Sequence, residues 1–231
     1  MENRVVVVTG AFGILGQAAV RRAVEMGARV AMVDIGAQKP GGAETAPAGP
    51  TFKLEGVDLA ASEAAHSAFA RIAAHFGGVD VLLNIAGGFV WETMADGDIA
   101  AWDRMFAVNL RTAVSACIAA LPLLEKSDSG AIVNVGANAA AKAGVGMGAY
   151  AAAKAGIAKL TESLAEEFKG RITANAVLPS IIDTPANRAA MPDADFGKWV
   201  RPEEIAEAML FLASRRSRAI TGALLPVTGG V

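Results

Sequence analysis

Short apolar runs alternate with helix-length stretches along the chain. The first run, Val5–Val8, contains only β-branched residues, which is typical of a strand buried on both faces. A glycine-rich turn and a helical stretch over Ile14–Met26 follow, and Gly27 is placed to end that helix. Arg29–Asp34 is a second buried strand. Strand, helix and strand in this order predict a right-handed βαβ unit with parallel strands.

The same alternation continues to the end of the chain. It predicts strands over Thr51–Val57, Val79–Ile85, Ala131–Val135, Ile172–Leu178 and Leu224–Val227, and helices over Ser62–Phe76, Ile99–Lys126, Gly148–Phe168 and Pro202–Ala213. We expect Ser62 to cap its helix and the long helix to bend before Pro122. Residues 36–50 are rich in Gly, Pro and Ala and are read as a loop. The pattern indicates one α/β domain over residues 1–231, a Rossmann-type, doubly wound parallel sheet of about seven strands with helices on both faces.

Composition narrows the class of protein. Hydrophobic residues make up 53% of the chain and charged residues 19%, which excludes a largely disordered chain. We expect no membrane span, because Gly, Pro or a charge interrupts every apolar run before the roughly 18 residues that a span needs. The net charge is −2 and basic residues form no run, so nucleic acid is not an expected partner.

Cysteine and histidine are too sparse to suggest a metal centre. Cys117 is the single cysteine, which excludes an internal disulfide and a cysteine-based zinc site. His66 and His75 have no partner at ligand spacing, so we expect no metal. The apolar strand pattern begins directly after Met1–Arg4 without the features of a signal peptide, and this favours a cytoplasmic protein.

Glycines recur at every third position, Gly10, Gly13 and Gly16, between the first strand and its helix. Glycines allow the backbone to approach a pyrophosphate, and a helix N-terminus offers N–H donors. The spacing differs from the common G-x-G-x-x-G pattern, so a tight structural turn is an equal reading. Asp34 lies 24 residues after Gly10, close to the roughly 20 expected for a carboxylate that binds ribose hydroxyls.

The charge at Asp34 bears on the choice of cofactor. A carboxylate there would repel a 2′-phosphate, and the following Ile35-Gly36 supplies no arginine to compensate. NAD(H) is therefore favoured over NADP(H). The alternative is that Asp34 is a solvated residue at the end of its strand.

Tyr150 is the only tyrosine, and Lys154 lies four residues later on the same face of the predicted helix. An ammonium group near a phenol favours the phenolate, so we expect Lys154 to lower the pKa of Tyr150 and suit it to proton transfer. In isolation, such a pair is more often a surface contact.

Several motifs together resemble the short-chain dehydrogenase/reductase family over nearly the whole chain. These are TGAFGILG, Asp34, Asp58 in VDL, the NIAG turn at Asn84–Gly87, Asn109 in FAVN, the Tyr150/Lys154 pair, Pro179 followed by Thr184, and the closing TGALLPVTGG. The resemblance implies an NAD(H)-dependent oxidoreductase that transfers hydride to or from a small carbonyl, hydroxyl or pterin-like substrate. It also implies a homodimer or homotetramer.

The resemblance assigns roles to matching positions. Tyr150 is the catalytic acid/base, Lys154 holds the nicotinamide ribose, and Asn109 bends its helix and supports a water relay. Asp58 contacts adenine, although it is equally read as a cap at the start of the next helix. Asn84 and Asn109 are alternatively buried amides that satisfy backbone groups. The implied cofactor-binding set is Gly10, Phe12, Gly13, Ile14, Leu15, Gly16, Asp34, Asp58, Leu59, Asn84, Ala86, Gly87, Tyr150, Lys154, Pro179, Ile182 and Thr184.

The chain departs from the family where a serine normally precedes the tyrosine by 13 residues. That position is Ala137 here, and losing one such donor typically costs about 10²–10³ in rate. Three readings follow: a substrate that needs one donor, a substitute donor in Asn138 or Ser180, or a slow or inactive protein. Trp91 and Met147 complete the expected substrate contacts, with an ordinary packing role as the alternative.

The same departure resembles one branch of the family, the quinonoid dihydropteridine reductases. The stretch AVLPSIIDTPANRAAMPDADFGKW over 176–199 and the segment GVGMGAYAAAKAGI are similar to that branch, which also has alanine at the serine position and no helix after the second strand. A pterin substrate develops no alkoxide, so the serine would be dispensable. The other readings are a 3-oxoacyl thioester reductase and, more remotely, a nucleotide-binding regulator without turnover.

Overall fold

A single parallel sheet organises the computed structural model, which describes residues 1–37 and 49–231. Within this part of the chain, seven strands are ordered β3-β2-β1-β4-β5-β6-β7, and every neighbouring pair is parallel. The strands are β1 (Val5–Thr9), β2 (Arg29–Val33), β3 (Thr51–Leu54), β4 (Val81–Asn84), β5 (Gly130–Val135), β6 (Ile172–Pro179) and β7 (Leu224–Val227). The predicted fold class is confirmed.

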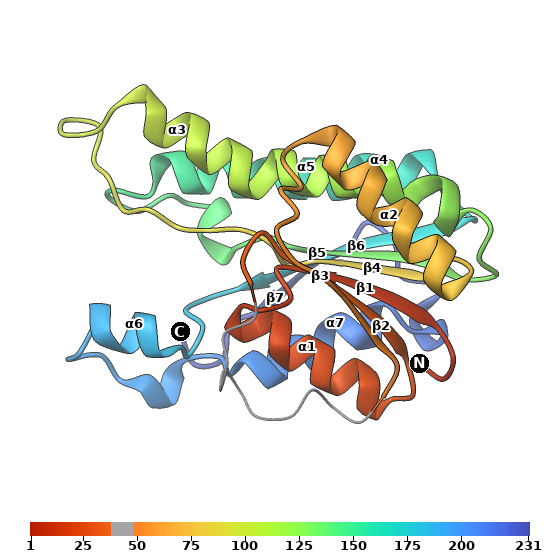
Figure 1. Ribbon diagram of the computed structural model, residues 1–231. Helices are drawn as coiled ribbons and strands as arrows, with labels where there is room; N and C mark the ends of the chain where they lie inside the picture. The colour runs from red at the N-terminus through yellow and green to blue at the C-terminus, as the bar shows by residue number, and fades with distance from the viewer. Residues whose placement is uncertain (38–48) are drawn as a thin grey trace.

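Helices cover both faces of the sheet (Figure 1). One layer contains α1 (Ile14–Glu25) and α7 (Pro202–Leu212), and the other contains α2 (Ser62–Phe76), α4 (Thr112–Leu124) and α5 (Gly148–Glu167). The chain also forms α3 (Ile99–Met105), the π-helical turn η1 (Phe106–Arg111), α6 (Pro185–Ala190), and the short 3₁₀ turns η2 (Asn138–Ala140), η3 (Phe196–Lys198) and η4 (Arg215–Ser217).

The valine run at β1 supplies both cores of the molecule. Val6 and Val8 pack in the core beneath α1 and α7, whereas Val5 and Val7 pack in the core beneath α2 and α4. Successive side chains of a strand point to opposite faces, so a strand between two helical layers must be apolar at every position. This requirement explains why the run shows no alternation with polar residues.

One local prediction about helices is wrong, and a second is confirmed with an added irregularity. Ser62 does not cap α2, because the N-cap position is Ala61 and no side chain caps it. The predicted long helix Ile99–Lys126 is continuous to Leu124, but it contains the π-helical turn η1 between α3 and α4. Pro122 lies inside α4, and the bend expected before it stays a prediction. The expected loop over 36–50 lies mostly outside the described residues.

The stretch Ile99–Leu124 is long and apolar enough to cross a membrane by length and composition. Half of its most apolar window is buried within the protein, where α4 residues such as Cys117, Ala120 and Leu124 pack beneath the sheet. Core packing therefore accounts for much of the apolar composition that this stretch shows.

Arg4 closes the amino end of the sheet. Its side chain is 7% exposed. The guanidinium donates hydrogen bonds to three backbone carbonyls, those of Ala213 (2.5 Å), Asp80 (3.2 Å) and Ser129 (2.5 Å). These carbonyls belong to three separate connections, so one side chain ties the starts of β1, β4 and β5 to the end of α7.

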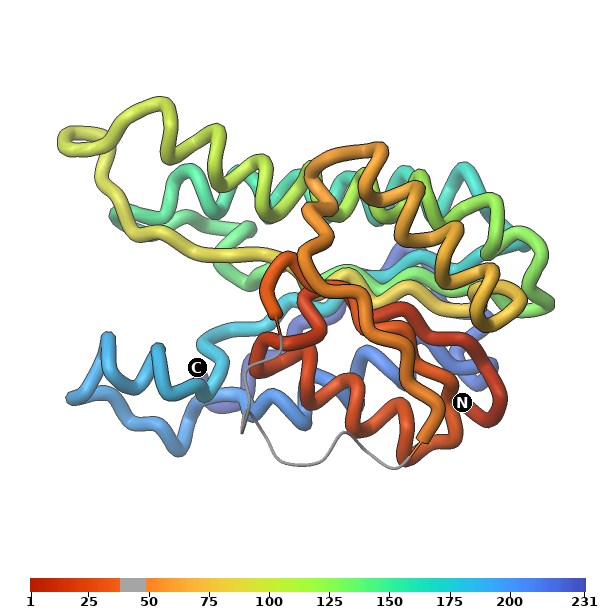
Figure 2. The backbone as a smooth tube through the Cα atoms, viewed as in Figure 1, coloured from red at the N-terminus to blue at the C-terminus, as the bar shows by residue number. Residues whose placement is uncertain are grey.

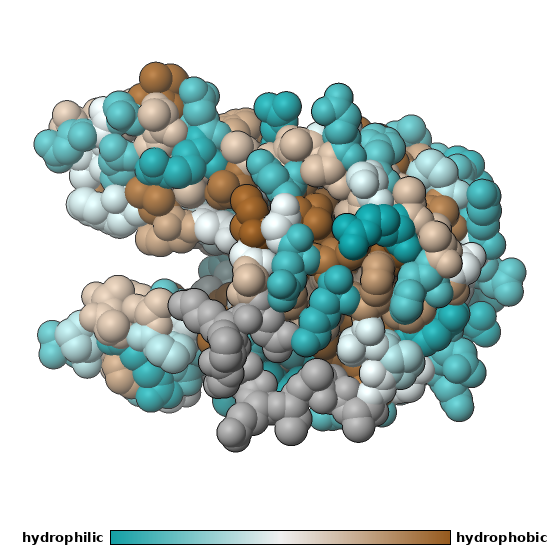
Figure 3. All heavy atoms as spheres, in the orientation of Figure 1, coloured by the Kyte–Doolittle hydropathy of each residue, from teal (hydrophilic) through white to brown (hydrophobic). Residues whose placement is uncertain are grey.

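The carboxyl end of the sheet is open. Two lobes extend beyond the strands there, one formed by the segment after β4 with the start of α3, and the other containing α6 (Figure 2). The space-filling view shows the surface hollowed between these two lobes (Figure 3). Ligands of doubly wound sheets bind outside the carboxyl ends of the strands, and the polar residues of the motifs lie at this edge.

Candidate active site

The glycine turn between β1 and α1 is packed too closely for side chains. Gly10 has φ +63°, and a Cβ there would lie 2.8 Å from the backbone of Ala86. A Cβ at Gly16 would lie 2.0 Å from the carbonyl oxygen of Gly10. Gly13 is exposed and is the N-cap of α1, with no side-chain cap. The turn therefore presents uncapped N–H groups at the carboxyl edge, as a phosphate site requires.

The other residues predicted along this turn divide between the core and the surface. Leu15 is buried in the core under α1, so only its backbone faces the turn. Ile14 is 48% exposed, and Phe12 is partly buried. The predicted contacts of these three residues with a cofactor stay predictions.

Asp34 is joined to the glycine turn. One carboxylate oxygen accepts a hydrogen bond from the Phe12 N–H (2.9 Å), and the other accepts from the Gly36 N–H (2.9 Å). The reading of Asp34 as a merely solvated residue is therefore incomplete, because its side chain fixes the end of β2 to the turn. Each oxygen accepts one of these bonds and retains acceptor capacity toward a sugar hydroxyl.

Asp58 lies on the surface beyond β3. Its carboxylate accepts from the Ala60 N–H (2.9 Å), and its carbonyl accepts from the Ala61 N–H (3.1 Å). Asp58 thus forms a turn leading into α2 and is not the N-cap of that helix. Leu59 is 4% exposed and packs in the core.

A buried polar chain lies beneath the NIAG turn. The Asn84 amide donates to Asn134 Oδ1 (2.9 Å) and contacts Cys117 Sγ (3.3 Å), and Asn134 donates to Thr161 Oγ1 (2.9 Å). These bonds link β4 through β5 to α5, so Asn84 joins other side chains here and does not satisfy the backbone as the alternative reading proposed.

Thr9 and Asn134 are structural residues of the site that the sequence analysis missed. The Thr9 hydroxyl accepts from the N–H groups of Ile85 (3.0 Å) and Ala86 (3.1 Å), and thereby holds the NIAG turn against β1. Both residues are polar positions in otherwise apolar buried strands. That interruption is a usable signal, because a buried polar group needs a partner.

Lys154 and Asn109 meet at Gly87. A Cβ at Gly87 would lie 2.6 Å from Asn109 Oδ1 and 3.5 Å from Lys154 Nζ. Asn109 bonds both the N–H and the carbonyl of Gly88, and also the Met105 carbonyl. It lies within the π-helical turn η1, so the helix is irregular at Asn109, and the reading of this residue as an amide that satisfies backbone groups is confirmed.

The Lys154 ammonium retains donors. Lys154 is 5% exposed, and within the described residues its ammonium donates one hydrogen bond, to the Val135 carbonyl (2.7 Å). Since an ammonium has three N–H donors, two remain for a ligand. Burial lowers the pKa of Lys154 to about 8.

The pKa of Tyr150 differs from the expectation. Burial raises the pKa of Tyr150 to about 12, whereas the sequence analysis expected Lys154 to lower this pKa. The geometry gives the reason: Lys154 Nζ lies over the face of the tyrosine ring, 5.8 Å from its centroid, and the ring meets the edge of Phe89 at 5.0 Å. Tyr150 therefore holds its proton at neutral pH.

The region around the missing serine is also defined. Ala137 is 5% exposed in extended backbone, two residues after the end of β5. Asn138 is exposed at the start of η2, so its role as a substitute donor stays a prediction. Ser180 donates its hydroxyl to the Thr228 carbonyl (2.8 Å), so its proton is already used. Met147 occupies the N-cap position of α5.

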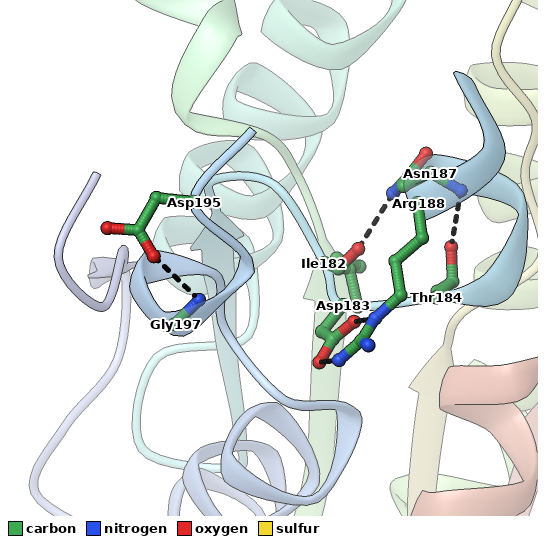
Figure 4. A network of polar contacts seen from close by, with 7 residues as sticks. All are labelled: Ile182, Asp183, Thr184, Asn187, Arg188, Asp195 and Gly197. Carbon is green, nitrogen blue, oxygen red and sulfur yellow. Dashed lines mark hydrogen bonds and ion pairs between the residues drawn. The ribbon is translucent and has the colours of Figure 1, made fainter. Parts of the chain in front are cut away.

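The segment after β6 is held by its own polar contacts (Figure 4). Thr184 caps α6 by accepting from the Asn187 N–H (3.1 Å), and the Asn187 side chain donates to the Ile182 carbonyl (2.8 Å). Arg188 forms a two-bond ion pair with Asp183 (2.6 and 2.8 Å). Pro179 is buried at the end of β6. The turn that carries Ile182 and Thr184 is thus fixed beside the carboxyl edge.

Taken together, the edge offers a closely packed glycine turn with an uncapped helix start at Gly13, a carboxylate at Asp34, and a cation with spare donors at Lys154 beside the phenol of Tyr150. These groups match, in order, a pyrophosphate, a ribose, a second ribose and a proton-transfer partner. The fold and this site define a dinucleotide-dependent oxidoreductase of the α/β class.

Comparisons with known proteins agree with this class. A family model described as enoyl-(acyl carrier protein) reductase matches residues 10–231. The chain is 31% identical to 2-(S)-hydroxypropyl-CoM dehydrogenase 3 of Xanthobacter autotrophicus, covering 100% of this chain and 97% of the relative. It is 36% identical to cis-4-hydroxycyclohexanecarboxylate dehydrogenase of Sinomonas cyclohexanicum, covering 99% and 96%.

A solved structure matches equally completely. The short-chain dehydrogenase/reductase of Brucella melitensis, described as a glucose/ribitol dehydrogenase, superposes with a TM-score of 0.90 at 28% identity, covering 100% of this chain and 97% of that one. The chain belongs to the short-chain dehydrogenase/reductase family. It is an oxidoreductase acting on hydroxyl or carbonyl substrates, in a family that uses NAD(P)(H).

Proposed function

We propose that the protein, working as one domain over residues 1–231, interconverts a secondary alcohol and its ketone with NAD(H). The observation that carries the proposal is that the Lys154 ammonium lies beside Gly87 and over the ring of Tyr150, at the edge where the glycine turn and Asp34 also lie. The names of the two relatives each contain a hydroxylated substrate, which supports a hydroxyl-bearing compound. A cytoplasmic homodimer or homotetramer is part of the same proposal.

The residues present fit NAD(H). A pyrophosphate would lie on the glycine turn and the first turn of α1, with one ribose on Asp34 and the other on Lys154. The negative charge of Asp34 disfavours a 2′-phosphate and supports NAD(H) over NADP(H). When bound, NAD(H) supplies or accepts the hydride.

Tyr150 transfers the proton to and from the substrate oxygen. Because its pKa is raised, its Oη carries a proton at neutral pH and donates it to a substrate oxygen as negative charge develops there. That transfer leaves Oη as a phenolate, and the reverse reaction begins from this phenolate, which takes the proton from the alcohol. Lys154 orients the cofactor ribose and adds positive charge beside the ring of Tyr150. The Ala137 side chain offers no second donor, so Tyr150 is the principal hydrogen-bonding partner of the reacting oxygen.

Tyr150→Phe tests this assignment because it removes one hydroxyl and keeps the ring. We expect kcat to fall about 10²–10⁴-fold, the usual contribution of a positioned proton donor, while NADH binding measured by fluorescence remains within about twofold. Normal turnover by the variant would refute the role of Tyr150. If the wild-type protein does not bind NADH, the cofactor assignment is refuted independently of the role of Tyr150.

A comparison of substrates distinguishes the dihydropteridine reductase alternative from the alcohol–ketone proposal. NADH oxidation is measured with a quinonoid dihydropterin, with a panel of ketones and with 3-oxoacyl thioesters. Ala137→Ser restores the missing hydroxyl at a buried position, so we expect it to raise the rate with ketones and to leave the rate with the pterin unchanged. Turnover confined to the pterin would replace the alcohol–ketone proposal with the dihydropteridine reductase alternative.

A further inference from the structure

Two exposed aromatic residues line one side of the candidate site. Phe89 and Trp91 are 54% and 60% exposed, and they lie two residues apart on the segment that follows β4. Trp91 is one of the substrate contacts predicted from the sequence, whereas Phe89 is not. Exposure of two large aromatic groups within one short segment is unfavourable unless a partner covers them.

Phe89 packs against the first turn of α5, and Trp91 packs against the segment that leads into that helix. The Phe89 ring meets the Tyr150 ring edge-on, with centroids 5.0 Å apart. The Trp91 indole lies on Gly146, whose φ is +72° and whose absent Cβ would stand 2.3 Å from the indole. The next residue, Glu92, donates its N–H to the Gly146 carbonyl (2.9 Å).

These contacts make a rigid wall. Phe89 pairs with Tyr150 and Trp91 pairs with Gly146, so the two segments run side by side in opposite directions. Glycine at position 146 is required twice, by its backbone conformation and by the indole that occupies the side-chain space. The aromatic wall, defined as Phe89 and Trp91, is therefore held in place before a substrate binds, and Tyr150 lies at its base.

We infer that Phe89 and Trp91 select a cyclic, apolar alcohol or ketone, whose ring packs on the aromatic wall while its oxygen reaches Tyr150. This inference rests on the proposed function. With alanine at position 137, a substrate oxygen has one hydroxyl donor fewer to orient it, so apolar contact must set the orientation. A rigid ring meets this need well, because it loses less rotational freedom on binding than an open chain of equal carbon number.

The experiment compares cyclohexanone with 2-hexanone, which have equal carbon numbers, as substrates of the enzyme with NADH. We expect kcat/KM to be about tenfold higher for cyclohexanone, mainly through KM. Phe89→Ala and Trp91→Ala should each reduce that ratio at least about fivefold, and Phe89→Leu, which keeps apolar bulk, should reduce it less. Phe211→Ala is the matched control, because Phe211 is 44% exposed on α7, away from the site.

Two results would overturn the inference: a wild-type ratio near one, or a ratio that Phe89→Ala and Trp91→Ala leave unchanged. If neither ketone is reduced, the proposed function fails, and binding of the same two probes to the NADH-loaded protein is measured by saturation-transfer NMR. Preferential binding of cyclohexanone that Phe89→Ala abolishes would still support the aromatic wall. Equal signals from the two probes would refute it.

Discussion

Two buried cations lie at opposite ends of the sheet, and the protein uses them differently. Arg4 at the amino end and Lys154 at the carboxyl end are 7% and 5% exposed. Arg4 donates to three backbone carbonyls that belong to three connections. Lys154, within the described residues, donates one hydrogen bond, to Val135. The two terminal nitrogens of Arg4 are committed to backbone carbonyls and only its Nε is buried without a partner, whereas Lys154 keeps donors for a ligand.

The amino end of the sheet thus contributes mainly to stability, and the carboxyl end contributes mainly to ligand binding. Burying a charge is costly unless hydrogen bonds compensate it. At the amino end the compensation is internal and complete enough to join several loops. At the carboxyl end more of the cost is left uncompensated, because the Lys154 ammonium makes one hydrogen bond within the described residues. Burial lowers the pKa of both cations, and that of Lys154 falls to about 8. A buried polar group can bind a ligand only if some of its hydrogen-bond donors or acceptors are not already used within the protein.

The largest expected effect concerns the amino end. Arg4→Met keeps much of the side-chain volume but leaves three carbonyls without their donor. We expect the free energy of unfolding to fall by about 3–5 kcal/mol, measured by denaturant titration. The control Arg21→Met removes an exposed ion pair with Glu203 and should cost less than about 1 kcal/mol. Equal losses in the two variants would break the contrast between the ends.

Removing the cation at the carboxyl end, Lys154, should not lower the free energy of unfolding at neutral pH. The pKa of Lys154 is lowered from 10.5 to about 8, so between pH 8 and 10.5 the unfolded chain binds the proton more tightly than the folded protein. Unfolding free energy therefore rises with pH across this window, by about 3 kcal/mol for this group. Lys154→Met lacks this rise and should be no less stable than wild type at pH 7, although its activity falls.

Lys159→Met provides the matched control on the same helix. Lys159 is exposed and paired with Glu162, so its removal should leave both the activity and the pH dependence of unfolding unchanged. Chemical denaturation at a series of pH values from 7 to 10.5 measures the difference between each variant and wild type. A parallel pH dependence in wild type and Lys154→Met would show that the ammonium is better compensated than its contacts indicate.

A smaller effect is expected at Asp34, where the carboxyl end meets the first ribose. Asp34→Asn removes the charge and keeps one acceptor for the Phe12 N–H. We expect the preference for NADH over NADPH, measured as a ratio of dissociation constants, to fall about tenfold. Thermal stability should change little. A ratio that stays constant would remove Asp34 from cofactor selection.

The smallest effect is expected at the segment that carries Thr184. Asn187→Ala removes the amide that donates to the Ile182 carbonyl, which loosens the turn without touching Tyr150 or Lys154. We expect KM for NADH to rise about three- to fivefold, equivalent to about 1 kcal/mol, with kcat nearly constant. A change confined to kcat would indicate that Asn187 acts on the chemical step.

Much of the fold was predictable because buried parallel strands leave a strong pattern. The run at Val5–Val8 predicted a strand, and the bounds of Ser62–Phe76 agree with α2. The glycines were expected to admit a pyrophosphate, which stays a prediction; the structure shows that Gly10 and Gly16 are packed against the backbone of the protein itself. Capping was less predictable. Ser62 has the right chemistry for an N-cap but lies one residue inside the helix, and periodicity does not resolve one residue.

The sequence predicted which residues lie close together at the site better than it predicted the pKa of Tyr150. The spacing of Tyr150 and Lys154 placed both on one helix face, but it does not show whether the ammonium lies beside the hydroxyl or over the ring. The structure places it over the ring, so burial decides the pKa of Tyr150. Phe89 was missed because it lies in an irregular segment, where no periodic pattern shows which residue meets Tyr150.

The π-helical turn at Phe106–Arg111 has a consequence for how this protein tolerates change in length. A π turn holds one residue more than an α turn, and one residue is worth about 100° of rotation. Deleting a single residue there would let α3 and α4 fuse into one regular helix, and it would swing Asn109 away from Gly88 while α4 kept its packing. A one-codon deletion in this turn would thus disable the site and spare the core, whereas the same deletion inside β1 would exchange its two buried faces.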